Sequence, residues 1–175
     1  MIRVLLLPAM FFLLTAAFIP SSPELGTAEA VCRPGETGPA LMVEIAGLKD
    51  HTGRLKIEVY PGTEDDFLAD DNKLLMAGKV FRRVDEPMPA GTPHVCVRLP
   101  GPGRVAVSVL HDRDSNHRFN WQHDGAGFSE NPHLGFSKPS AKSVAFYAGP
   151  GITPVRVIMN YRTGLLSFGP IAGAR

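Results

Sequence analysis

The chain has 175 residues with a formal net charge of +1, and 44% of its residues are hydrophobic. This length predicts a single domain once a short N-terminal segment is set aside. A chain so close to neutral has no extended basic surface, so we expect no binding to nucleic acid and no electrostatic binding to anionic lipid.

Residues 1–30 have the pattern of a secretory signal peptide. Arg3 provides a positive start, residues 4–19 are almost entirely apolar, and Ala28-Glu29-Ala30 fits the small-x-small cleavage rule. The alternative is a retained anchor, but the apolar run is shorter than the roughly 20 residues of a spanning helix. We therefore expect cleavage after Ala30, export to the periplasm or the medium, and no stable membrane span afterwards.

The chain contains two cysteines, Cys32 and Cys96. An exported chain with two cysteines most simply forms one disulfide, because the compartments outside the cytoplasm are oxidising. A redox pair is the weaker alternative, since the C-x-x-C spacing is missing. We predict a structural bridge that ties the N-terminal arm across the outside of a sheet.

About seven short segments have the alternating apolar pattern of half-buried strands, separated by turns rich in glycine and proline. The first two and the last two are expected to form β-hairpins across short glycine-containing turns. The segments cover residues 40–47, 54–60, about 77–84, 94–99, 104–110, 142–147 and 153–161.

One short helix is expected from Thr63 to Ala69, with Thr63 as its N-cap and acidic residues in its first turn. No strand alternates with a long amphipathic helix, which excludes a nucleotide-binding α/β sheet. The pattern predicts an all-β fold, an antiparallel immunoglobulin-like or transthyretin-like β-sandwich. We place the domain at residues 31–162 and a flexible, glycine-rich tail at residues 163–175.

A long polar loop, residues 111–135, follows the strand at 104–110. Its oxygen-bearing side chains match the first three ligand positions of an EF-hand-type calcium loop, but glycine and glutamate are missing at positions six and twelve. The alternative is an Asx-turn loop, in which these side chains bond their own backbone. The residues of the predicted calcium site are Asp112, Asp114, Asn116 and Asp124.

The same loop is the candidate binding surface, represented by His111, Trp121 and Phe128. Loops of this length are usually functional or packed by their own side chains. Its aromatic residues, which include Phe119 and Phe136, either form a platform for a ligand or plug the open end of the sandwich. We favour the plug, because the open end of the sandwich would otherwise be exposed to solvent.

The sequence contains no recognisable catalytic motif. It has no Gly-x-Ser-x-Gly elbow, no phosphate-binding loop and no His-Glu-x-x-His pair. We therefore predict no catalytic residues and no bound cofactor apart from the calcium alternative. A hydrolase with an unrecognised site is a third reading, because folds of this class host many functions.

Five stretches of the chain carry a family resemblance: GLKDHTGRLKIEVY, EDDFLADD, GRVAVSVLHDRDSNHRFN, GFSENPHLGFSKP and VRVIMNYR. They resemble secreted bacterial proteins grouped as domain of unknown function 2141, and the resemblance covers residues 41–162. It implies an exported immunoglobulin-like or transthyretin-like sandwich without an established activity, in which many relatives carry glycine at the position of His117.

These patterns together predict a non-enzymatic binding or structural module of the bacterial envelope, with residues 111–135 as its working surface. Rigid sandwiches commonly carry function on their end loops. The partner is an envelope or extracellular ligand that the sequence does not identify. The alternative is a calcium-stabilised secreted domain.

Overall fold

A computed structural model describes residues 19–135, 137–171 and 173. The apolar run of the predicted signal peptide, apart from Ile19, lies outside these residues. The helices are α1 (Asp71–Met76) and α2 (Ala141–Val144). The strands are β1 (Ala40–Ala46), β2 (Arg54–Pro61), β3 (Arg82–Pro87), β4 (His94–Arg98), β5 (Gly103–Asp112), β6 (Gly125–Phe128), β7 (Phe146–Ala148), β8 (Ile152–Ile158), β9 (Asn160–Arg162) and β10 (Phe168–Pro170).

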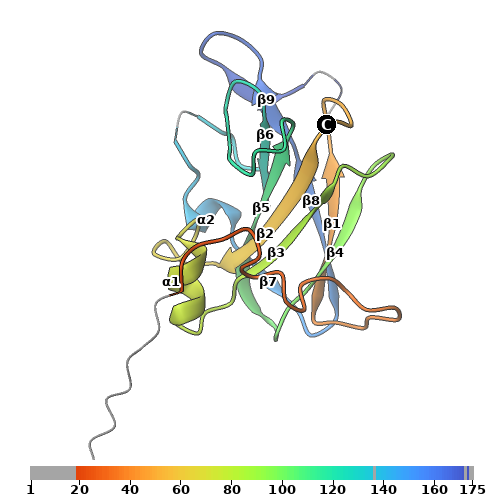
Figure 1. Ribbon diagram of the computed structural model, residues 1–175, viewed down its shortest axis with the longest axis vertical. Helices are drawn as coiled ribbons and strands as arrows, with labels where there is room; N and C mark the ends of the chain where they lie inside the picture. Colours follow the sequence, from red (N-terminus) through yellow and green to blue (C-terminus); the bar gives the residue numbers. More distant parts are fainter. Residues whose placement is uncertain (1–18, 136, 172, 174–175) are drawn as a thin grey trace, which may run out of the picture.

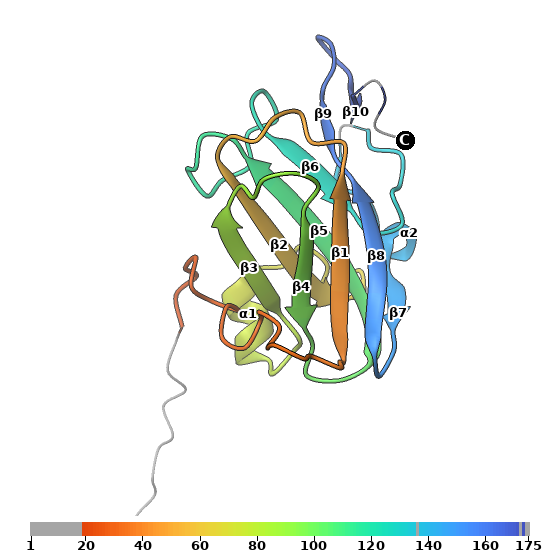
Figure 2. The same ribbon diagram turned by 90° about the vertical axis from the view of Figure 1, so that its right-hand side faces the viewer.

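Two sheets face each other, which confirms the predicted β-sandwich (Figures 1 and 2). The smaller sheet has the order β4-β1-β8. The larger has the order β10-β9-β6-β5-β2-β3, and β7 also pairs with β5. The pair β1–β8 is parallel, whereas the prediction was antiparallel throughout, and the remaining named pairs are antiparallel.

Alternating aliphatic residues form the core between the sheets, as the period-two pattern predicted. Each strand presents every second side chain to one face, so three apolar residues per strand are enough to cover it. The innermost strands contribute Leu41, Val43 and Ile45 from β1, Leu55, Ile57 and Val59 from β2, and Val105, Val107 and Val109 from β5.

Both predicted hairpins are wrong, because consecutive strands belong to different sheets. β1 pairs with β4 and β8, whereas β2 pairs with β3 and β5. In the same way β7 pairs with β5, whereas β8 pairs with β1. Alternation identifies the apolar face of a strand but does not say which strand supplies its backbone hydrogen bonds.

The predicted short helix at residues 63–69 is a series of turns instead, and α1 begins later, at Asp71. Leu68 has a φ of +59°, which a right-handed helix does not contain. Residues 142–147, predicted as one strand, are divided between α2 and β7. The predicted tail contains β10, which pairs with β9.

The outer face of the larger sheet carries a second hydrophobic cluster, which both helices cover (Figure 1). Tyr60 packs edge-on against Phe67 and Phe81, with ring centroids 5.8 and 5.3 Å apart. Phe67 in turn meets Phe128 at 5.9 Å. Strands β2 and β5 are therefore covered on both faces over part of their length.

The predicted disulfide between Cys32 and Cys96 is present. It attaches the N-terminal arm to β4, and next to it Val31 forms an isolated bridge with Val97. The bridge closes a long loop, which restricts the unfolded chain and adds roughly 4 kcal/mol of stability in the chain-entropy model.

Residues 19–30, which the predicted cleavage would remove, pack against the sandwich. The buried Arg83 guanidinium donates to the carbonyls of Ser22, Pro23 and Leu25 at 2.8–3.2 Å. It also pairs with two buried carboxylates, those of Glu58 and Asp71. Ala30 is fully buried in the main core. This segment is therefore part of the packed structure.

We expect a chain that begins at Val31 to be less stable than one that begins at Ile19, by about 2 kcal/mol or more. The shorter chain loses three acceptors of a buried charged donor and the packing of Ala30. Urea denaturation of the two chains measures the difference. Equal midpoints would show that residues 19–30 do not stabilise the fold.

Candidate functional site

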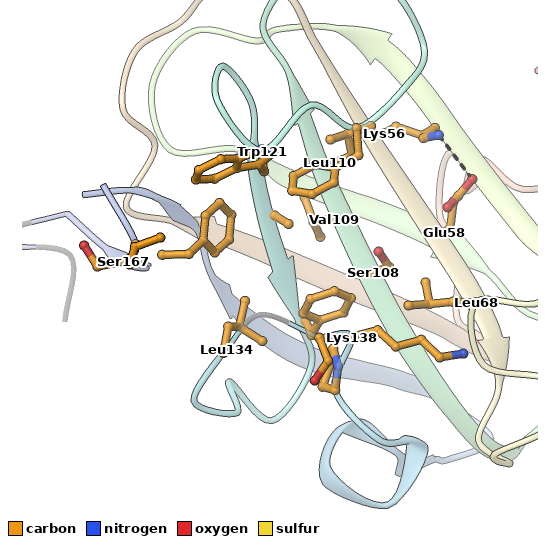
Figure 3. Close-up of a pocket in the computed structure, with 18 residues that line it drawn as sticks. Lys56, Glu58, Leu68, Ser108, Val109, Leu110, Trp121, Leu134, Lys138 and Ser167 are labelled. Carbon is orange, nitrogen blue, oxygen red and sulfur yellow. Dashed lines mark ion pairs between the residues drawn. The ribbon is translucent and has the colours of Figure 1, made fainter. Parts of the chain in front are cut away.

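A cavity of about 600 Å³ opens on the outer face of the larger sheet, beside the second hydrophobic cluster (Figure 3). Its volume lies within the range typical of small-molecule sites. Most of its lining is hydrophobic. The lining residues are Lys56, Glu58, Leu68, Ser108, Val109, Leu110, Phe119, Trp121, Ala126, Phe128, Leu134, Gly135, Ser137, Lys138, Pro139, Leu166, Ser167 and Phe168.

Outward-facing positions of three adjacent strands form the floor of the cavity. Ser108 and Leu110 alternate with the core valines of β5, so they point away from the sandwich. Ala126 lies opposite Leu110 on β6, and Lys56 lies opposite it on β2. Small residues at two of these positions leave room above the sheet.

Three separate segments of the chain form the walls. They are Phe119 and Trp121 of the polar loop, residues 134, 135 and 137–139 before α2, and residues 166–168 from the turn after β9 to the first residue of β10. The Phe119 and Phe168 rings meet edge-on with centroids 6.1 Å apart. The Arg162 guanidinium lies 4.7 Å from the centroid of the Trp121 ring.

The loop aromatics do not plug the end of the sandwich, so that interpretation is wrong. Phe119 is 53% exposed and Trp121 is 42% exposed, and both line the cavity. Phe128 lies in β6, is nearly buried and packs in the second cluster. The Phe136 side chain lies outside the described residues. The aromatics thus form a wall that a ligand can contact.

The cavity is charged at one end (Figure 3). The Lys56 ammonium lies 3.6 Å from a Glu58 oxygen, and Glu58 also accepts from Arg83 at 2.8 Å. The Tyr60 hydroxyl donates to the same carboxylate at 2.7 Å, and burial followed by the Glu58 charge raises the pKa of Tyr60. Lys138 has no ion-pair partner among the residues that the structure describes.

His111 does not reach the cavity, because it lies on the core-facing side of β5 and is fully buried. Its Nδ1 accepts from the Tyr161 hydroxyl at 2.7 Å, and its Nε2 donates to the Thr52 carbonyl at 2.8 Å. Burial lowers the pKa of His111, although the Thr52 hydrogen bond acts in the opposite direction. This neutral imidazole links β5, β9 and the turn before β2.

An ion pair between Arg113 and Asp50 holds the base of the polar loop in place. Arg113 donates from its Nε to Asp50 at 2.9 Å and from its Nη1 to the His123 carbonyl at 2.9 Å. Burial acts to raise the pKa of Asp50, but hydrogen bonds from Arg113 and Thr52 outweigh it and keep that pKa well below its ordinary value. Arg113 therefore attaches the loop to Asp50 in the turn before β2 and also holds His123 of the same loop close to the end of β5.

Three of the four predicted calcium ligands come together. Carboxylate oxygens of Asp112, Asp114 and Asp124 all lie within 4.8 Å of one another. Asp112 and Asp124 are each 1% exposed. Burial, then the hydrogen bond with Asp114 and the charge of Asp124, raise the pKa of Asp112, although backbone hydrogen bonds act against this rise.

These carboxylates also accept hydrogen bonds from the loop backbone, as the Asx-turn alternative predicted. Asp112 accepts from the His117 amide at 2.7 Å, and Asp124 accepts from the Asn120 amide at 2.7 Å. Asn116 donates its side-chain amide to Asp114, and its oxygen accepts from the Arg118 amide. His117 has a φ of +62°, a conformation that favours glycine at this position.

Most of the cavity was not predicted from the sequence, in particular its floor positions and the wall at residues 166–168. The only available signal was the set of small or apolar residues on the outward face of predicted strands, such as Ala106 and Ser108. That pattern indicates close packing as readily as an open space. Of the three residues that represent the candidate binding surface, Trp121 and Phe128 line the cavity, whereas His111 is buried in the core.

The fold and the cavity define a disulfide-bonded β-sandwich whose outer sheet face carries an apolar ligand-sized site. The chain belongs to the family described as "Uncharacterized protein conserved in bacteria (DUF2141)", whose model matches residues 43–155. No curated protein and no solved structure matched the chain. No helix in the described part of the chain is long and apolar enough to cross a membrane.

We expect the free energy of unfolding to fall as the pH drops below about 6.5, because His111 is neutral in the folded state. The imidazole of the unfolded chain takes up a proton there, whereas the lowered pKa keeps buried His111 neutral to lower pH. The unfolded state then binds more protons, and the fall is at most about 1.4 kcal/mol per pH unit.

Urea denaturation at pH 7 and pH 5 measures this change. His111→Gln keeps a donor and an acceptor but does not titrate, so its pH dependence should be smaller. His94→Gln is the control, because His94 is exposed and should leave the wild-type dependence intact. An unchanged dependence in His111→Gln would contradict the assignment.

Proposed function

We propose that this protein is an exported, non-enzymatic binding module that holds an apolar ligand in the cavity on the outer face of the larger sheet. The observation that carries the proposal is the cavity itself, with its volume of about 600 Å³ and its hydrophobic and aromatic lining. Concave apolar sites with a few convergent polar groups are the usual form of small-molecule sites.

The surrounding structure supports a site that is formed before a ligand arrives. The floor belongs to β2, β5 and β6, which are central strands of the larger sheet. The polar loop is held at its base by the Arg113–Asp50 ion pair and by His111. A rigid site loses less conformational entropy on binding than a mobile one.

Export is supported by the signal-like pattern of residues 1–30 and by the disulfide between Cys32 and Cys96. Disulfides persist in oxidising compartments and are rare in the cytosol. The ligand in this proposal is therefore one that the protein meets in the periplasm or outside the cell.

We expect the purified protein to bind the neutral probe N-phenyl-1-naphthylamine, with a rise in probe fluorescence. Ser108→Phe adds a large side chain to the cavity floor and should weaken binding at least tenfold, because it occupies the volume that the probe needs. Trp121, the one tryptophan of the chain, provides a second signal through energy transfer.

Ser143→Phe is the matched control, since Ser143 is exposed on α2 and does not line the cavity. It should leave probe binding at the wild-type level. The proposal fails if the wild-type protein does not bind the probe, or if both substitutions weaken binding equally.

A second candidate function is that of a calcium-stabilised domain. The observation that favours it is the pair of buried carboxylates, Asp112 and Asp124, that face each other without a cationic side chain paired to either in the described residues. Buried like charges repel, and a divalent cation with oxygen ligands would remove the repulsion.

If calcium binds there, 10 mM calcium should raise the midpoint of thermal unfolding, and chelator should reverse the rise. At a concentration 100 times the dissociation constant, the gain is about 2.7 kcal/mol. Asp124→Asn should abolish the gain, whereas Asp65→Asn, on an exposed residue, should not. An unchanged midpoint in the wild-type protein would remove calcium from consideration.

A further inference from the structure

We infer that the ligand of this cavity is a single-chain anionic amphiphile, with its apolar chain against the aromatic wall and its carboxylate beside Lys138. This inference rests on the proposed function and adds the chemical class of the ligand. It depends on how apolar and charged groups are distributed along the cavity.

The two ends of the cavity differ in chemistry (Figure 3). Trp121 and Ser167 lie at one end, and Phe168, the next residue after Ser167, packs edge-on against Phe119. The Lys56–Glu58 pair, Leu68 and the Lys138 ammonium lie at the other end, with Ser108 between the two. A ligand that fills such a site has an apolar body and one polar end.

The charges at the polar end select the sign of that polar group. Glu58 is shared between Lys56 and Arg83, and Arg83 also pairs with Asp71, so both buried carboxylates have cationic partners. Lys138 pairs with no carboxylate in the described residues. Among the charged side chains that line the cavity, Lys56 and Glu58 pair with each other and Lys138 is left over, so the lining has a net positive charge.

Glu64 is a carboxylate whose charge interacts with that of Lys138, but the two form no ion pair in the described part of the chain. Both oxygens of Glu64 accept backbone hydrogen bonds at the start of α2, from the amides of Ala141 and Lys142 at 3.1 and 3.0 Å. Those hydrogen bonds and then the Lys138 charge lower the pKa of Glu64, so it stays ionised and turned toward α2. The Lys138 ammonium is left to meet an anion at the mouth of the cavity.

The hydrophobic lining of the cavity favours an apolar chain as the other part of the ligand. Each methylene group that enters the cavity should tighten binding by about fourfold, the ratio that corresponds to burial of one such group. An acyl chain meets this requirement, because it can bend to follow the wall from the polar end to the rim at Leu166.

The test titrates the protein with dodecanoate, dodecan-1-ol and dodecyltrimethylammonium, each below its micelle concentration, and follows Trp121 fluorescence. Dodecanoate should bind at least threefold more tightly than the alcohol and more tightly than the cation. Decanoate should bind about sixteenfold more weakly than dodecanoate, because it lacks two methylene groups. Raised salt should reduce the preference for the anion.

Lys138→Met removes the charge and keeps the length of the side chain. It should weaken dodecanoate binding about threefold to fivefold, in keeping with a partly exposed ion pair, and leave dodecanol binding unchanged. Lys142→Met is the matched control, since Lys142 is exposed and does not line the cavity. Retained dodecanol binding in Lys138→Met also shows that the variant is folded.

The outcomes separate the two proposals. If all three amphiphiles bind equally, or the cation binds best, while the neutral naphthylamine probe still binds, the ligand class is wrong and the binding function stands. If neither the probe nor any amphiphile binds, the binding function itself fails. Binding of dodecanoate that does not depend on Lys138 would also overturn the inference.

Discussion

The constraint on which the rest of this structure depends is that β5 is covered on both of its faces. Its inner face packs valines against the smaller sheet, and Ala106 on its outer face packs into the aromatic cluster beneath the helices. The two clusters together fix the part of the strand around Ala106 in position. At Ser108 and Leu110, where the outer cluster ends, the same strand becomes the floor of the cavity.

A buried polar arrangement attaches α1 and the N-terminal segment to the outer face of the larger sheet. Arg83 connects Glu58 on β2, Asp71 on α1 and the carbonyls of the N-terminal segment. An unpaired buried charge is strongly unfavourable, so each member depends on the others. Glu58, the carboxylate that lines the cavity, is thereby committed to cationic partners within the protein.

The polar loop combines two roles that the sequence did not separate. Its base is structural, because His111, Arg113 and the Asp112–Asp124 region bind the loop to β5, to the turn before β2 and to the loop's own backbone. Its middle part is a surface, because Phe119 and Trp121 turn toward the cavity. A single stretch of residues thus supports the fold at one point and offers a contact surface at another.

The fold class and the disulfide were predictable from the sequence by itself. The alternation at Leu55, Ile57 and Val59 requires a second sheet to cover the apolar face, and two cysteines in one chain can pair in only one way. The sheet to which each strand belongs was decided only by the tertiary structure. An apolar residue at every second position shows which face of a strand is buried, but it does not specify which strand is hydrogen-bonded beside it. The cavity, too, was decided only by the tertiary structure. It is a space between Lys56, Trp121, Lys138 and Phe168, and residues so distant along the chain become a site only when three strands and three loops have taken their places.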